Sequence, residues 1–168
     1  MKKALIALFS AILISLGVAG CSTSSSLVLY AVEYSSGPNA RTKADTEILA
    51  FRFGRPGDGG FARDAATWEF ANGYIPQRGL VDGYQKVQTS VWVKWKTLSD
   101  GRIHEATAEF DNKLPRDMTN CEIFFTTYSN KLTVYLVTAE RGNSLTDPDH
   151  MPIKADQFKT IRLFESTN

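Results

Sequence analysis

The chain has 168 residues, of which 43% are hydrophobic and 22% are charged, so its composition is that of an ordinary globular protein. Its 19 basic and 18 acidic side chains nearly cancel, which argues against the strongly positive surface of a general nucleic-acid binder. Two cysteines are too few for a scaffold that is held together by disulfides.

The first segment, Met1–Gly20, has the organisation of a secretion signal. Lys2 and Lys3 form a positive start, and the mainly apolar stretch from Ala4 to Val18 is about 15 residues long. A membrane-spanning helix needs roughly 20 apolar residues, so this stretch is too short to span a bilayer comfortably. We therefore expect Met1–Gly20 to be removed from the mature protein.

The end of this segment, Val18-Ala19-Gly20-Cys21, resembles the lipobox of bacterial lipoproteins. The resemblance implies that the Cys21 thiol carries a lipid, whereas the alternative is an ordinary signal peptide with a chance cysteine. Enteric-type lipoproteins that stay in the inner membrane often have Asp after the cysteine, so Ser22 implies the outer membrane. Residues 22–26 are a short polar tether, which would hold a periplasmic domain close to that membrane.

Residues 27–168 are expected to form a single β-rich domain. Runs of alternating or continuous apolar residues, rich in Val, Ile and aromatic side chains, predict the strands. The predicted strands are Leu27–Tyr34, Ile48–Phe53, Lys86–Thr97, Arg102–Phe110, Cys121–Tyr128, Leu132–Thr138 and Thr160–Phe164.

Two hairpins are predicted from turn residues between these strands. Leu98–Gly101 contains Asp-Gly, which tolerates a positive φ, and Ser129-Asn130 separates the other pair. In Lys86–Thr97 the residues alternate, so Val91, Val93 and Trp95 are expected to face the core while Trp92 and Lys94 face the other way.

The remaining segments are predicted as connections. Ser35–Thr46 and Arg141–Pro152 are long polar loops, and Leu114–Met118 is a turn or a one-turn helix. Phe61–Asn72 is compatible with a short helix or a strand, and Met151–Phe158 with a short helix opened by Pro152. The fold class expected is mostly β: an antiparallel meander sheet or a small β-sandwich, with one or two short helices.

The sequence offers no clear catalytic constellation. His104 is expected on a strand in a structural role, and His150 in a solvated loop, Thr146–His150, without the ligand spacing of a zinc or calcium site. A Gly-x-Ser-x-Gly elbow is absent, and Gly54–Gly60 lacks the Lys-Ser/Thr of a phosphate loop. Cys121 is expected to be a buried, inert thiol. We therefore predict no enzyme activity, no cofactor and no metal site.

Protein binding is the alternative use for the exposed residues. The glycine-rich loop and its neighbours supply Arg55, Asp58, Arg63 and Asp64 as candidate partner-binding residues, although the loop could be only a turn. Trp92 with Lys94 is a second candidate, because aromatic residues are enriched in binding hot spots. If a second layer covers that face, Trp92 belongs to the core instead.

Four stretches resemble a family of small proteobacterial lipoproteins with a β-rich domain. These stretches are Val91–Arg102, Glu105–Thr107, Leu114–Thr119 and Leu132–Leu136. Some members act, or are presumed to act, as periplasmic immunity proteins against phospholipase effectors of type VI secretion. The resemblance implies inhibition of such a lipase by protein binding, and it supplies no catalytic residues. The alternatives are a structural or assembly lipoprotein of the cell envelope and a small-ligand-binding domain, which would need a roomy apolar cavity.

Overall fold

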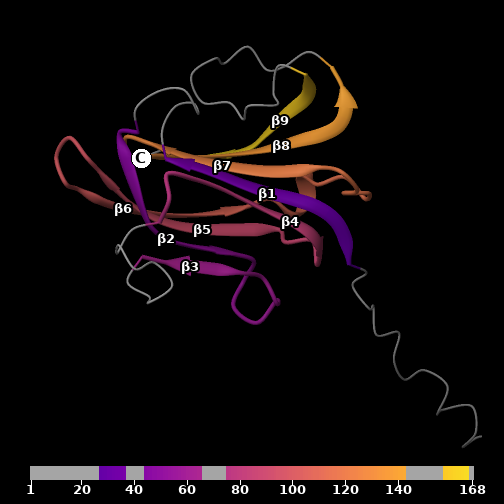
Figure 1. Cartoon of the computed structure of the whole chain (residues 1–168), viewed down its shortest axis with the longest axis horizontal. Coiled ribbons are helices and arrows are strands. Elements are labelled where there is room, and N and C mark those ends of the chain that lie inside the picture. The colour runs from indigo at the N-terminus through magenta and orange to yellow at the C-terminus, as the bar shows by residue number, and fades with distance from the viewer. Residues whose placement is uncertain (1–26, 37–43, 66–74, 143–156, 167–168) are drawn as a thin grey trace, which may run out of the picture.

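Nine β-strands form two sheets that lie face to face (Figure 1) within residues 27–36, 44–65, 75–142 and 157–166, which are those that the computed structural model describes. The strands are β1 (Val28–Ser36), β2 (Thr46–Phe53), β3 (Ala62–Asp64), β4 (Arg78–Gln85), β5 (Ser90–Thr97), β6 (Ile103–Glu109), β7 (Glu122–Tyr128), β8 (Lys131–Arg141) and β9 (Phe158–Glu165). The expected mostly β fold is confirmed, in the form of two sheets.

The first sheet has five strands in the order β4-β1-β7-β8-β9, and the second has four in the order β3-β2-β5-β6. All neighbouring strands are antiparallel except β1 and β7, which are parallel. Because β1 enters the sheet between β4 and β7, the topology is not a simple meander of consecutive strands.

The hairpin of β5 and β6 forms as the alternation predicts. Val91, Val93 and Trp95 are fully buried, whereas Trp92 and Lys94 point to the other side and are only partly covered. Gly101 has a φ of +71°, and the Asp100 carboxylate accepts a hydrogen bond from the backbone N–H of Arg102. The regular strand begins at Ser90, later than the predicted start at Lys86.

The turn between β7 and β8 is anchored to the opposite sheet. Ser129 has a φ of +51°, which is unusual for a residue other than glycine. Its carbonyl oxygen accepts hydrogen bonds from the Trp95 indole, at 2.9 Å, and from the Thr97 hydroxyl, at 3.3 Å. Its backbone N–H donates to the Asp45 carboxylate. These bonds hold the turn in its conformation and tie the two sheets together at this end.

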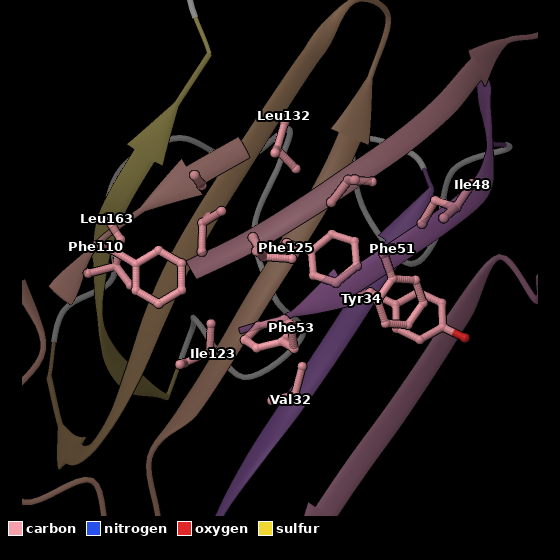
Figure 2. Close-up of a cluster of buried hydrophobic side chains, with 14 of the residues drawn as sticks. Val32, Tyr34, Ile48, Phe51, Phe53, Phe110, Ile123, Phe125, Leu132 and Leu163 are labelled. Carbon is pink, nitrogen blue, oxygen red and sulfur yellow. The ribbon is translucent and has the colours of Figure 1, made fainter. Parts of the chain in front are cut away.

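Aromatic side chains fill the space between the sheets. Tyr34 of β1, Phe51 and Phe53 of β2 and Phe125 of β7 meet there (Figure 2). The ring centroids of Tyr34 and Phe51 are 4.8 Å apart, and those of Phe51 and Phe125 are 5.2 Å apart. Tilted and edge contacts of this kind suit the charge distribution of aromatic rings, so this cluster fixes how the sheets pack.

Strand β4 was not expected from the sequence. Its segment, Arg78–Gln85, contains Gly79 and Gly83, which weaken a strand pattern. Every residue of β4 nevertheless pairs with β1, from Val28 opposite Gln85 to Ser35 opposite Arg78. The pairing partner, not the local sequence, makes this segment a strand.

Other boundaries also differ from the predictions. Within Phe61–Asn72, the structure shows the short strand β3, and the rest of that range lies mainly outside the described residues. A 3-10 turn, η1 (Asp111–Lys113), comes just before the predicted Leu114–Met118 turn. The predicted signal segment, the predicted tether, His150 and most of the predicted Met151–Phe158 helix lie outside the described residues. No helix in the described ranges is long and apolar enough to cross a membrane.

Candidate functional site

The outer surface of the four-stranded sheet gathers the aromatic and charged residues that the sequence analysis singled out. Strand pairing places the residues in rows, since directly opposed residues of antiparallel strands point to the same side. We call this surface the Trp92 face. Its rows are Ala62, Arg52, Trp92 and Thr107; Asp64, Ala50, Lys94 and Glu105; and Glu47, Lys96 and Ile103.

Trp92 lies on β5, between β2 and β6, and is partly exposed. The Arg52 guanidinium carbon is 5.5 Å from the centroid of the Trp92 ring, which is the geometry of a cation–π contact. The indole N–H donates to the Glu105 carboxylate at 2.6 Å. Within the described residues Trp92 is therefore part of an outer surface and not of the core, and its ring is held in place before any partner binds. Such preorganisation lowers the entropy lost on binding.

Charged side chains of both signs surround this tryptophan. Lys96 is 2.5 Å from the Glu47 carboxylate, and Arg55 is 2.6 Å from the Glu109 carboxylate. Lys94 lies opposite Glu105, and no ion pair of Lys94 occurs within the described part of the chain. Exposed ion pairs contribute little to stability, so this pattern is better suited to selecting a partner than to holding the fold.

The predicted binding residues do not all lie together. Asp64, Trp92 and Lys94 share the Trp92 face, whereas Arg63 of β3 is paired opposite the buried Phe51 and therefore faces the sandwich interior. Burial raises the pKa of Tyr34, and the positive charge of Arg63 partly opposes this shift.

The glycine-rich loop places the other two candidates beside the Trp92 face. Arg55 is exposed and its ion pair with Glu109 joins the loop to the end of β6. Asp58 lies in a tight turn, where its backbone N–H donates to the Arg55 carbonyl oxygen. Gly54, Gly57 and Gly59 all have a positive φ, so the turn requires glycine.

Two residues of the Trp92 face were missed from the sequence. Arg52 and Glu105 hold the Trp92 ring, but Arg52 is on β2, far from Trp92 in the chain, and Glu105 is on the hairpin partner β6. The alternation of Ile48–Phe53 could have placed Arg52 on the outer side of its strand. Its contact with Trp92 depends on the strand register, which the sequence does not give.

A second polar site lies on the outer side of the five-stranded sheet. Glu33 of β1 and Glu122 of β7 are both 3% exposed, and the Arg78 guanidinium of β4 contacts the Glu33 carboxylate. Burial, followed by the hydrogen bond to Glu122 and the charge of that residue, raises the pKa of Glu33 to about 7, although Arg78 opposes the shift. This group is an acid that can lose a proton near neutral pH.

A pocket of about 350 Å³ opens beside Glu122. Its lining combines polar and apolar residues from β1, β4, β7 and β8, among them Leu29, Asp82, Glu122 and Val137. Its size is at the lower end for a small-molecule site, and it is open to solvent instead of being an enclosed apolar cavity. This geometry gives the ligand-binding alternative no specific support.

The other candidate reactive groups have structural surroundings. His104 stacks on Trp95 with ring centroids 5.5 Å apart, and its Nε2 is 2.9 Å from the Thr97 hydroxyl oxygen. Cys121 is buried in the core, and burial raises the pKa of its thiol, which lowers its reactivity. Within the described ranges, no group of three His, Cys, Asp or Glu residues could hold a metal ion.

Comparison of the chain with protein-family models, with curated proteins and with solved structures gives no significant match in any of the three.

Proposed function

We propose that this chain is a lipoprotein anchored in the outer membrane through Cys21, and that its β-sandwich acts in the periplasm by binding a protein. The observation that carries the proposal is the Trp92 face: an aromatic ring held by Arg52 and Glu105 within a surface of mixed charge. Binding hot spots are enriched in tryptophan and arginine, and a ring that is already ordered contributes affinity at low entropic cost.

The partner that we propose is a lipase effector of type VI secretion, which the chain would inhibit as an immunity protein. Support comes from the lipobox, which predicts a position in the compartment where such a lipase would act, and from the four stretches that resemble lipoproteins with this role. An inhibitor of this kind blocks the enzyme sterically and needs a stable scaffold with a recognition surface, not catalytic groups of its own.

The test starts from the lipidated full chain, tagged at its C-terminus and extracted in mild detergent. We expect it to capture a lipase from cells that carry the effector, and the activity of that purified lipase to fall to a residual level at an equimolar ratio. Capture of envelope-assembly proteins without any lipase, or a captured lipase that stays fully active, would contradict the immunity function and favour the structural alternative.

Trp92 provides the sharper test of the binding face. Truncation of a central, partly covered tryptophan costs about 2 kcal/mol or more at an interface, so Trp92→Ala is expected to weaken inhibition by at least about 30-fold. The matched control is Lys131→Ala, because Lys131 is an exposed residue of the other sheet. Equal inhibition by both variants would exclude the Trp92 face as the contact surface. Circular dichroism of each variant checks that the fold is retained.

A further inference from the structure

Three large apolar side chains are exposed together at one corner of the sandwich. Leu27 is 63% exposed, Leu29 is 37% exposed and Tyr84 is 74% exposed. Leu29 of β1 is paired directly with Tyr84 of β4, and Leu27 immediately precedes β1. We call these three residues the apolar corner. Leu80, 56% exposed, lies four residues before Tyr84 and points to the same side of β4.

The apolar corner is at the point where the chain leaves the proposed lipid anchor. The first residues of β1 lie beside the last residues of β4, because Val28 is paired with Gln85 (Figure 1). Leu27 is only six residues after Cys21. A fully extended chain spans at most about 3.6 Å per residue, so six residues keep Leu27 within about 22 Å of the lipidated cysteine.

We propose that the apolar corner docks into the head-group region of the membrane that holds Cys21. The proposal rests on the lipidation of Cys21 in the proposed function, since the short tether would hold the apolar corner near the membrane surface. A tethered surface meets its target at an effective concentration in the millimolar range, so weak apolar contacts are enough. Tyrosine suits this position, because its ring is apolar and its hydroxyl can remain in the hydrated layer.

The charge on the same face indicates which lipids are preferred. Asp82 lies on β4 between Leu80 and Tyr84 and is exposed, and its carboxylate would be repelled by anionic head groups. Docking is therefore driven by apolar burial and does not require anionic lipid. We expect zwitterionic vesicles of phosphatidylethanolamine and phosphatidylcholine to be sufficient.

Docking would also orient the Trp92 face. Leu29 and Tyr84 point outward from the five-stranded sheet, whereas Trp92 points outward from the four-stranded sheet on the other side of the sandwich. A domain that rests on the apolar corner turns its recognition surface away from the membrane and toward the periplasm.

The experiment measures the depth of two labelled positions in the lipidated full chain, reconstituted in those zwitterionic vesicles. A thiol-reactive fluorophore is attached through Asp82→Cys, beside the apolar corner, or through Glu105→Cys, on the Trp92 face. Both carry Cys121→Ala so that only one thiol is labelled. Lipids with a nitroxide near the head group quench a fluorophore that enters the interface. We expect strong quenching of the Asp82→Cys label and little quenching of the Glu105→Cys label.

Adding Leu29→Ser and Tyr84→Ser to the Asp82→Cys chain is expected to remove most of this quenching, because the tether remains while the apolar side chains are gone. Quenching that is equal at the two positions, or that survives the two serine substitutions, would overturn docking. So would an unquenched Asp82→Cys label, because it would show that the corner stays outside the membrane interface. Incorporation of radioactive palmitate separates the two proposals: without it both the anchor and the docking fail, whereas with it an unquenched label removes the docking alone.

Discussion

Glu33 is a carboxyl group whose surroundings disfavour its charge. It is buried on the outer side of the five-stranded sheet, next to the carboxyl group of Glu122, and among the described residues Arg78 offers the compensating charge. Burial is the largest cause of the shift, so the folded protein holds a proton on Glu33 that the unfolded chain releases at a lower pH. A difference of this kind couples folding to pH.

The sign of the coupling follows from the direction of this shift. The pKa of Glu33 is about 7 in the folded state against 4.5 without the protein environment. The contribution of Glu33 to the free energy of unfolding is therefore fully present below pH 4.5 and is lost as the pH rises through 7. We expect the free energy of unfolding to fall by about 2–3 kcal/mol between pH 5 and pH 8 from this group. Denaturant unfolding across that range measures it.

Glu33→Gln tests the assignment, because the amide stays neutral at every pH. The variant is expected to lose this part of the pH dependence, whereas Glu105→Gln, at an exposed carboxylate, should keep it. If Glu33→Gln retained the wild-type slope, another group would be responsible for the coupling.

At the scale of elements, β4 shows how a partner strand can impose structure on a weak sequence. Gly79 lies on the inner side of β4, and a Cβ atom at this position would overlap the ring of Tyr34. The ring of Tyr34 packs in turn on Phe51 and Phe125 (Figure 2). The glycine that weakens the strand pattern is therefore the residue that lets β4 lie against the core.

This packing predicts that Gly79→Ala destabilises the protein. An added methyl group must displace the Tyr34 ring from a close-packed aromatic cluster, at a cost of about 1–3 kcal/mol. Leu80→Ala is the matched control, since Leu80 is 56% exposed and its truncation should change stability by no more than about 0.5 kcal/mol. The midpoints of urea unfolding compare the two. Equal midpoints for Gly79→Ala and the wild type would show that the Tyr34 ring can move aside without a loss of stability.

At the scale of the whole molecule, the two outer surfaces of the sandwich differ in character. One carries the Trp92 face, with its ordered ring and mixed charges, and the other carries the apolar corner, beside the start of β1. The proposed function requires such a division, because a surface that faces the bilayer is closed to a large partner.

The proposed lipid anchor gives a prediction for the intact cell. Cys21→Ser removes the thiol that the proposed lipobox presents, so the protein is expected to move from the membrane fraction to the soluble fraction and to incorporate no palmitate. The near-ultraviolet circular dichroism of the purified variant should match the wild type, since Cys21 precedes the sandwich. Ser26→Ala is the control, because it changes the tether and leaves the lipobox intact. A Cys21→Ser chain that stays in the membrane fraction would contradict lipid anchoring.

The sequence alone determined the features of the fold that depend on residues close together in the chain. Alternation in Lys86–Thr97 placed Val91, Val93 and Trp95 on one face and Trp92 on the other, and Asp100-Gly101 located a hairpin turn; that the Trp92 face is an outer surface came from the structure. These signals are local, since strand geometry repeats every two residues and a turn needs only a few. The mostly β fold could be predicted for the same reason.

The tertiary structure decided what depends on contacts between distant segments. It made Arg78–Gln85 a strand, paired β1 with β7, brought Arg52 to Trp92 and turned Arg63 away from that tryptophan. It also brought Glu33 close to Glu122, although they are far apart in the chain. Strand order and register depend on which segments pair and bury their apolar faces best across the whole chain, so local periodicity does not specify them.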